Sequence, residues 1–504
     1  MKKTAAIVLV AISCLLGAIL IVPAFVDLGI FKSTYLPLIE DALHRRVDVR
    51  EVRLTLIPTP SIRLSDLKIS DSPAFPENIF FAARQLQLRL KVLPLIRGRF
   101  EVRELVLDKP VINLVKKPDG SFNYADLADK KIALAPKAAR KNRGVQKPQE
   151  LIALPFVLPA RMRIKDGELN VQTKGRPPLT ITAIELSLQE ITGDRPFPYR
   201  IAFDYPGVNS VELEGLLTYQ EDDATLKLDG SRLKIDQLTL PLNGNITRLT
   251  TAPSFNLRAS SDNVDSKAFF KVLSGLGLVP RDTNFSGPMK VNLSLTGPSQ
   301  SLVAQLRSRF DGVEVDRKKS VRGTVNGEML IKLPGGSGPV SRRLQGDGKL
   351  IARDGELTNV NLIKKVQSVT GFIGFSREQS REATTFKTLE TDFVLDQGVA
   401  DFKRIHIVNP QMEASGLGTM TLDQPKLNVA MDTALLARSM SRSVTGKAVA
   451  FFKDGEGRIV VPLKITGPVE NPAVDLDTEK LVAKGMPLSK EKNFGSLFRQ
   501  LFRR

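Results

Sequence analysis

The chain has 504 residues, of which 42% are hydrophobic, so it can bury a sizeable core and is not disordered overall. This length exceeds one ordinary globular core and calls for several domains or an elongated, repetitive architecture. The sequence contains no Trp and only five Tyr, so packing depends on aliphatic side chains and Phe. Such a composition suits broad apolar surfaces better than tight small-molecule pockets.

The N-terminal segment Thr4–Val26 carries no charge and directly follows Lys2 and Lys3. As a helix it would rise about 34 Å, enough to cross a bilayer. We therefore expect an uncleaved transmembrane anchor. A cleavable signal peptide is the alternative, although its apolar region is usually about 7–15 residues. The single cysteine, Cys14, falls inside this segment, so the remainder of the chain has no disulfides.

Lys2 and Lys3 before the anchor favour a cytoplasmic N-terminus, but Lys32, Arg45 and Arg46 follow the anchor, so the count of positive charges alone does not decide the orientation. A short basic N-terminus followed by one early span is typical of a signal-anchor, which exports everything that follows it. We therefore expect the bulk of the chain outside the cytoplasm.

Beyond the anchor the hydrophobic period is two, which predicts strands with one apolar and one wet face. In Arg84–Val92 the apolar residues alternate with Gln, Arg and Lys. Two later stretches show the same alternation. The aliphatic positions of these three stretches, our candidates for contact with lipid, are Leu86, Leu88, Leu90 and Val92; Ile184, Leu186 and Leu188; and Val291, Leu293 and Leu295.

Asp-Gly and Asn-Gly pairs punctuate these runs and predict turns of an antiparallel meander, because their residues tolerate positive φ. The five pairs are Asp166-Gly167, Asp229-Gly230, Asn243-Gly244, Asp311-Gly312 and Asp354-Gly355. Two short echoes, KDGEL at 165–169 and RDGEL at 353–357, suggest repetition without establishing it.

A few helices are expected among the strands, at Thr34–Arg46, Ser266–Leu276 with Asp265 as its N-cap, and Val360–Phe375. The C-terminal tail has apolar residues at helical spacing, accompanied by arginines, which suits a helix lying on a membrane surface or one capping the sheet. Its residues are Phe494, Leu497, Phe498, Leu501 and Phe502, with Arg499, Arg503 and Arg504.

These helices are too few to cover the apolar face of so long a sheet. Either two sheets pack as a sandwich, or one sheet curls and leaves an open hydrophobic groove. A groove lined by Leu, Ile and Val would suit acyl chains, with polar headgroups at its rim.

The stretch Leu36–Leu127 resembles the N-terminal region of the bacterial AsmA-like family. The resemblance lies in Leu93-Pro94-Leu95 with Gly98, in ELVLDKP at 104–110, and in Asp119-Gly120 leading to Asn123. Gly346–Leu357 and Phe386–Leu435 resemble the family's C-terminal region. Membership implies a single-pass inner-membrane protein whose periplasmic part resembles lipid transporters with a repeating β-groove, and therefore a long curled antiparallel sheet forming an open groove.

We accordingly expect six regions. They are an anchor at 1–27, an AsmA-like N-terminal β region at 28–128, a basic flexible loop at 129–150, a middle β-groove region at 151–345, an AsmA-like C-terminal β region at 346–477, and a basic amphipathic tail at 478–504. The basic loop either contacts anionic headgroups or is a solvated insertion.

The expected function is binding of phospholipid acyl chains for transport or homeostasis between the inner and outer membranes, with other envelope proteins as partners that complete a bridge. Roughly 25 strands at about 4.8 Å reach no more than about 120 Å, so one molecule would not span the envelope alone. A non-enzymatic role in outer-membrane protein assembly or targeting is the alternative that the resemblance allows.

Other function classes find little support. The only histidines are His44 and His406, so no nucleophile–base pair can be named, and no metal-ligand spacing or phosphate loop is present. We therefore expect neither catalysis nor a cofactor. The net charge of +19 is compatible with nucleic-acid binding, but the basic residues are dispersed along the sequence and no aromatic residues are interleaved with them. Anionic lipid headgroups explain this charge more simply.

Overall fold

The computed structural model describes residues 36–37, 40, 43–55, 59–71, 78–96, 101–116, 122–124, 159–173, 177–191, 195–220, 224–249, 253–317, 320–336, 338–358, 360–362, 364–366, 383–436 and 452–483. The expected anchor, the basic loop at 129–150 and the helix of the C-terminal tail lie outside these residues, as does most of Val360–Phe375. Within the described part of the chain, no helix has the length and apolar character needed to cross a membrane.

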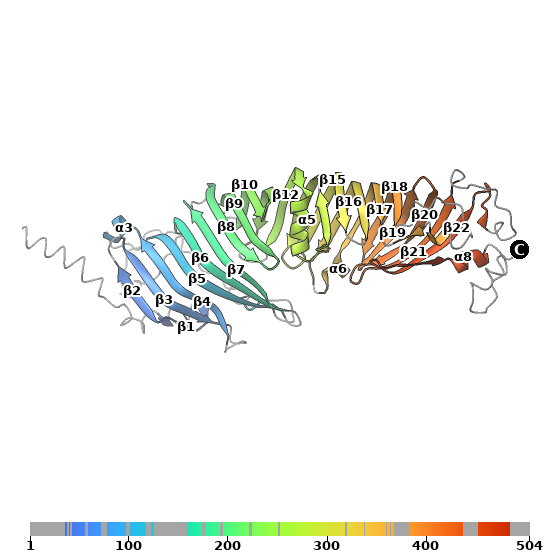
Figure 1. Ribbon diagram of the computed structural model, residues 1–504. Helices are drawn as coiled ribbons and strands as arrows, with labels where there is room; N and C mark the ends of the chain where they lie inside the picture. Colours follow the sequence, from blue (N-terminus) through green and yellow to red (C-terminus); the bar gives the residue numbers. More distant parts are fainter. Residues whose placement is uncertain are drawn as a thin grey trace, which may run out of the picture. The chain divides into compact units, whose positions relative to one another are not determined.

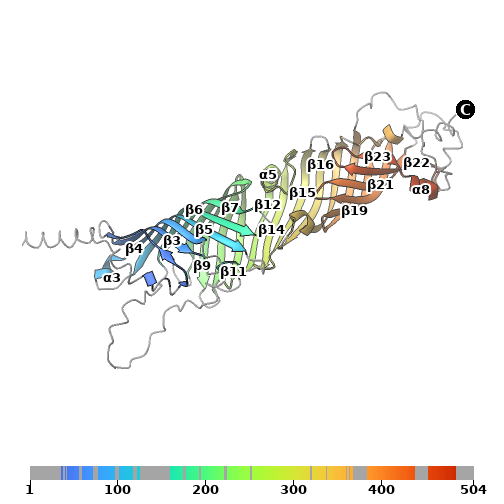
Figure 2. The ribbon, with the colours of Figure 1, turned by 90° about the horizontal axis from the view of Figure 1, so that it is seen from below.

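The fold is mainly β, as predicted, and its sheet is open rather than closed (Figures 1 and 2). The chain divides into two compact units, residues 1–254 and 255–504. The strands of unit 1 are β1 (Val47–Asp48), β2 (Glu51–Thr55), β3 (Ser61–Ser70), β4 (Ile79–Leu90), β5 (Val102–Lys116), β6 (Arg161–Thr173), β7 (Leu179–Gln189), β8 (Phe197–Tyr205), β9 (Val208–Gln220), β10 (Thr225–Ile235) and β11 (Leu238–Thr247), with the short helix α3 (Val92–Ile96) between β4 and β5.

Unit 2 continues the same pattern of long strands. It contains β12 (Ser254–Asp265, starting at the unit boundary), β13 (Thr283–Ser286), β14 (Pro288–Pro298), β15 (Val303–Arg317), β16 (Val321–Pro334), β17 (Gln345–Leu357), β18 (Thr384–Asp396), β19 (Val399–Val408), β20 (Met412–Thr421), β21 (Lys426–Leu435), β22 (Val460–Pro468) and β23 (Ala473–Leu476), and the helices α5 (Ser266–Gly275), α6 (Val340–Arg343) and α8 (Thr478–Ala483).

In unit 1 the strands pair largely in chain order. Both β1 and β2 pair with β3, and the sheet then runs from β3 through β4, β5 and β6 to β11. The β5–β6 pair is parallel, whereas the other described pairings are antiparallel. This departs from the expected antiparallel meander. A parallel pair needs a long connection that returns the chain to the same end, and the residues between 117 and 160 supply its length.

The Asp-Gly pairs do not form the predicted turns, because each lies inside a long strand. Asp166-Gly167 in β6, Asp229-Gly230 in β10 and Asp311-Gly312 in β15 fall where the strand register shifts. These are β-bulges, in which an extra residue adopts a conformation that a turn also requires. Asp166 and Asp354, from the two echoed pentapeptides, share this feature, with φ of 50° and 48°. The sequence signal was correct for the backbone conformation and wrong for the topology.

In two of these bulges, an asparagine side chain on the neighbouring strand accepts a hydrogen bond from the backbone amide of the bulge glycine. Asn243 Oδ1 on β11 accepts a hydrogen bond from the Gly230 amide at 3.2 Å, and Asn326 Oδ1 on β16 accepts one from the Gly312 amide at 3.0 Å. Both glycines have positive φ. The repeated glycine–asparagine arrangement lets a strand bend without leaving the bulge amide unpaired.

One buried carboxylate joins the three strands around the parallel pair. Glu104 on β5 accepts from Arg89 Nη1 on β4 at 2.8 Å and from Arg163 Nε on β6 at 2.6 Å. Burial of Glu104 raises its pKa, but the hydrogen bonds and positive charges of Arg163 and Arg89 outweigh burial and hold the pKa below its ordinary value. The ionised form is therefore favoured by folding.

We predict that Glu104→Gln destabilises unit 1 by about 1 kcal/mol, which is less than the roughly 1.5–3 kcal/mol typical of hydrogen bonds to charged groups, because both guanidinium groups are more than a third exposed. The folded pKa lies below the unfolded one, so this stabilisation is complete above the unfolded carboxyl pKa of about 4 and disappears as pH falls through the folded value. Urea denaturation at neutral and acidic pH measures the difference. Glu101→Gln, which removes an exposed ion pair with Lys91, is the control. A Glu104→Gln deficit that persists in acid would contradict this assignment.

Directly after its first strand, β12, unit 2 has a helix packed on the sheet. α5 has the expected N-cap, because the Asp265 carboxylate accepts from the Lys267 and Ala268 amides. The Phe270 ring stacks on Phe285 at 3.7 Å between centroids and lies 6.3 Å from Phe310. α5 thus covers one end of the face that β14 and β15 present.

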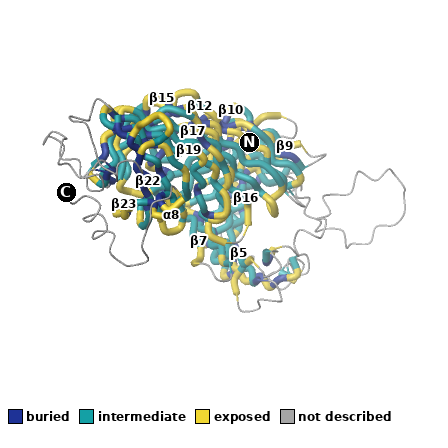
Figure 3. Tube along the Cα trace, turned by 90° about the vertical axis from the view of Figure 1, so that its right-hand side faces the viewer, coloured by how far each residue is buried: buried dark blue, intermediate teal, exposed yellow. Residues whose placement is uncertain are grey.

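The other end of unit 2 holds a dense core. Its fully buried members come from β20, β22, α8 and the segment 360–366: Leu362, Val366, Met412, Ala414, Val461, Leu463 and Leu481. Figure 3 shows buried positions gathered around β22. The strands pair in chain order from β14 to β19, and β19 pairs with β20. The core therefore lies at the C-terminal end of this run of strands.

Close packing in this core depends on glycine. A Cβ at Gly418 would lie 2.4 Å from the Asn428 carbonyl oxygen and 2.5 Å from the Val429 Cα, both in the backbone of β21. We predict that Gly418→Ala destabilises unit 2 by about 1–3 kcal/mol, since backbone must move to admit the methyl group. Thermal or urea unfolding measures this. Gly455→Ala, where a Cβ meets no atom within 4 Å, should be close to neutral. Equal effects of the two substitutions would refute the packing argument.

Candidate functional site: the apolar face

The strand register of unit 2 aligns uncharged residues in rows that cross the sheet. We define the apolar face of unit 2 by three such rows. They are Leu293, Leu306, Ile331, Gly346, Leu395, Ala400, Met420, Leu427 and Gly467; Val291, Ser308, Met329, Gly348, Phe393, Phe402, Gly418, Val429 and Ile465; and Met289, Phe310, Gly327, Leu350, Thr391, Ile405, Gly416, Met431 and Leu463. Ser308 and Thr391 are their only polar members.

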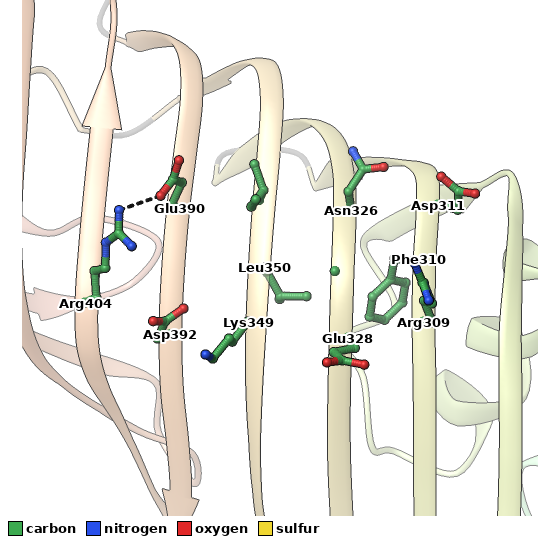
Figure 4. A pocket seen from close by; sticks show the side chains of 12 residues that line it. Arg309, Phe310, Asp311, Asn326, Glu328, Lys349, Leu350, Glu390, Asp392 and Arg404 are labelled. Atoms are coloured by element: carbon green, nitrogen blue, oxygen red, sulfur yellow. Dashed lines mark hydrogen bonds and ion pairs between the residues drawn. The ribbon is translucent and has the colours of Figure 1, made fainter.

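The opposite side of the same strands carries a row of alternating charge. Its members are Arg309, Glu328, Lys349, Asp392 and Arg404, each aligned with the next across neighbouring strands (Figure 4). They border a hollow of about 520 Å³, and Arg404 also donates to Glu390 at 2.7 Å. Cross-strand pairs of opposite charge stabilise the pairing and fix its register. We call this side the charged face.

Burial differs along the apolar face. Met289, Val291 and Phe310 are buried beside α5, and Met431, Leu463 and Ile465 are buried in the C-terminal core. Between these ends the aliphatic side chains of the first row are only half-buried at Leu293, Leu306, Ile331, Leu395 and Leu427, whereas its Ala400 is buried. The sheet is open here, so no second layer among the described residues seals these positions. The sandwich alternative therefore applies only to the two covered ends.

An apolar pocket of about 270 Å³ lies where the open part of this face meets the core. Its walls are Leu389, Phe402, Ile405 and Ile407 on β18 and β19, with Val360 and Leu362 at the core side. Almost all of the lining is hydrocarbon, so water gains little by filling it. A hydrocarbon tail matches this environment.

Three polar groups border the pocket. The hydroxyl oxygens of Ser320 and Thr391 are buried and have no hydrogen-bond partner in the described structure. Arg317 forms ion pairs with Asp282 at 3.3 Å and Glu470 at 3.5 Å. Because two carboxylates offset its charge, Arg317 does not make the pocket a strong anion site, and the pocket's chemistry favours a chain over a headgroup.

Unit 1 carries its own apolar face, built in the same way. One row joins Leu64, Leu86, Leu107, Ile164, Leu186, Ile201, Leu213, Leu233 and Leu240, and another joins Ile62, Leu88, Leu105, Met162, Leu188 and Tyr199. Apart from the buried Leu240 and Tyr199, these side chains are half-buried.

The structure brings most of the sequence candidates onto these faces. Leu86, Leu88, Leu186 and Leu188 lie in the rows of unit 1, with Ile184 half-buried on the same strand as the last two, and Leu90 buried at the end of β4. Val291 and Leu293 lie in the rows of unit 2, and Leu295 aligns with Ala304 of β15. Whether they contact lipid stays a prediction.

Val92 departs from the expected pattern. β4 ends at Leu90, and Val92 begins α3, where 52% of its surface is exposed. The alternation extended the strand too far because Pro94, which has no amide hydrogen, cannot continue a sheet ladder and is tolerated in the first turn of a helix.

Several site residues escaped the sequence analysis. Gly327, Gly346 and Gly348 belong to the apolar rows but look like turn residues in sequence, and Thr391 and Arg317 look like ordinary strand polar residues. Only cross-strand register places them on one face. Within the described residues, no three His, Cys, Asp or Glu side chains come together as a metal site.

A sequence model of the AsmA family matches residues 1–156. The N-terminal part of the chain is AsmA-like. The match includes the motifs at 93–98, 104–110 and 119–123 and confirms the resemblance over the N-terminal part, whereas the resemblance of the AsmA-like C-terminal β region stays a prediction. No curated protein and no solved structure matches the chain.

Proposed function

We propose that this AsmA-like protein is anchored in the bacterial inner membrane by residues 1–27 and holds its β units in the periplasm. There it binds phospholipid acyl chains on its apolar faces, without catalysis, and serves lipid transport or homeostasis between the inner and outer membranes. The family match, the uncharged segment Thr4–Val26 and the open sheet support this assignment.

The observation that carries the proposal is the apolar row that runs from Leu293 and Leu306 to Leu427, in which the leucines and Ile331 are only half-buried. Leaving aliphatic surface in water costs about 25 cal/mol per Å², and each buried CH₂ of a ligand gains about 0.8 kcal/mol. A monomer rarely exposes so extended an apolar surface unless something covers it. An acyl chain lying across the strands would cover it, while its headgroup stays in solvent.

We predict that the full chain, extracted gently, retains phospholipid and that Leu293→Glu lowers the bound amount severalfold. A buried charge on the apolar face would oppose a hydrocarbon chain. The matched control is Asn292→Glu, one residue away on the exposed side of β14, which should retain lipid at the level of the unmodified protein. In unit 1, Leu88→Glu and Gln87→Glu form the corresponding pair.

Lipid mass spectrometry of the purified proteins, with circular dichroism to verify folding, measures these effects. Lipid-free unmodified protein, or equal retention by both members of a pair, would overturn the proposal. Normal lipid retention together with direct crosslinks to outer-membrane assembly machinery would indicate the protein-assembly role instead.

A further inference from the structure

The apolar pocket of unit 2 is lined by parts of the sheet that lie far apart in strand order. Ile405 comes from β19 and Val469 follows β22, whereas Arg317 and Val321 lie on either side of the turn between β15 and β16. Six strands, β16 to β21, separate β15 from β22 in the pairing order. The pocket therefore lies between two portions of one sheet that curls over itself.

These two portions meet at diagonally opposite corners of the sheet. When the register is followed from strand to strand, Val321 and Val460 lie at the same end of the strands. Glu470 follows β22 at its opposite end, yet its carboxylate contacts Arg317. Neighbouring strands rotate by about 20–25°, so the seven pairings from β15 to β22 accumulate a rotation of roughly 140–175°. This twist brings the far corner of the sheet back over the apolar face.

The Arg317 guanidinium holds the two corners together. Its Nη2 lies 3.5 Å from Glu470 Oε1, and its Nε lies 3.3 Å from Asp282 Oδ1 on the segment before β13. The Arg317 side chain is 18% exposed and the Glu470 side chain is 72% exposed, so their ion pair, which we call the clasp, lies between the pocket and solvent. Exposed ion pairs stabilise weakly and are screened by salt, so the clasp can open and close again.

The pocket has an open side and a blind side. Leu427 lines the pocket and is also a half-buried member of the first apolar row, so the open part of the face leads into the pocket. On the other side, Leu362 belongs both to the lining and to the C-terminal core, where it is fully buried. A long apolar ligand can therefore enter from the row and must stop at the core.

We propose that this pocket is the binding site for the methyl end of one acyl chain, and that the clasp closes its wall around the chain. The hydrocarbon lining excludes a headgroup, because a phosphate or an ammonium group would lose its hydration there without gaining a partner. Arg317 is not that partner, since two carboxylates already offset its charge. The inference rests on the acyl-chain binding assigned under the proposed function, and it adds which part of the lipid is held and where.

Photo-crosslinking of the full chain tests where the end of the acyl chain lies. Two phosphatidylethanolamine probes are compared, one with a diazirine near the methyl end of an acyl chain and one with a diazirine next to the ester. We expect the methyl-end probe to label peptides from 357–362, 389–407 and 427–431, which line the pocket, and the ester-side probe to label them severalfold less. Equal labelling by the two probes overturns the proposal, as does methyl-end labelling confined to β14 and β15.

Lipid mass spectrometry of the same samples separates this inference from the proposed function. Bound phospholipid without methyl-end labelling of the pocket overturns the pocket assignment alone. Protein that binds no phospholipid overturns both.

Glu470→Gln tests the clasp, because it removes a charge without changing a side chain that lines the pocket. The matched control is Asp423→Asn, which removes an exposed ion pair between α6 and the turn that joins β20 and β21. We expect a pyrene-labelled phospholipid to pass from Glu470→Gln to vesicles severalfold faster than from the unmodified protein, and at an unchanged rate from Asp423→Asn. Salt should accelerate this transfer more for the unmodified protein than for Glu470→Gln. Equal transfer rates for Glu470→Gln and Asp423→Asn overturn the clasp.

Discussion

The structure depends on one constraint, the separation of apolar and charged side chains onto opposite faces of strands whose register is fixed. Because side chains alternate along a strand, a one-residue slip between β15 and β16 would place Arg309 or Glu328 among the aliphatic rows. The ladder from Arg309 to Arg404 opposes such slips by pairing unlike charges across successive strands. The charged face thus fixes the strand register, and this register aligns the apolar side chains on the opposite face.

Long strands must also bend, and the chain uses bulges for this. Each Asp-Gly bulge adds one residue to its strand and so shifts the alternation of side chains by one position. If even-numbered residues point to one face before the bulge, odd-numbered residues point to that face after it. In β15 the apolar face is supplied by Phe310 before the bulge and by Val313 after it. A bulge increases local twist and lets a strand curve while most ladder hydrogen bonds persist. The asparagines opposite Gly230 and Gly312 satisfy amides that the ladder leaves free.

The two ends of the unit 2 apolar face are covered by other elements, whereas its middle is not. α5 and its Phe270 stack cover the first strands, and the segment 360–366 with α8 buries the last ones. Only the intervening rows remain half-exposed, and the pocket bounded by Ile405 and Val360 lies at the transition. A surface that is closed at its ends and open between them suits a ligand that is long, apolar and variable in detail.

The sequence by itself determined the strand-rich fold, the aliphatic alternation at Leu86, Leu186 and Leu293, the capped helix at Asp265 and the AsmA-like N-terminal region. Each of these is local, because it depends on residue types within a few positions of one another. Tertiary structure alone decided that Asp-Gly pairs are bulges rather than turns, that β5 and β6 are parallel, and that Gly346, Thr391 and Arg317 belong to the apolar face or its pocket. These depend on which strand lies beside which, and a positive φ or an alternating pattern carries no information about its neighbour across the sheet.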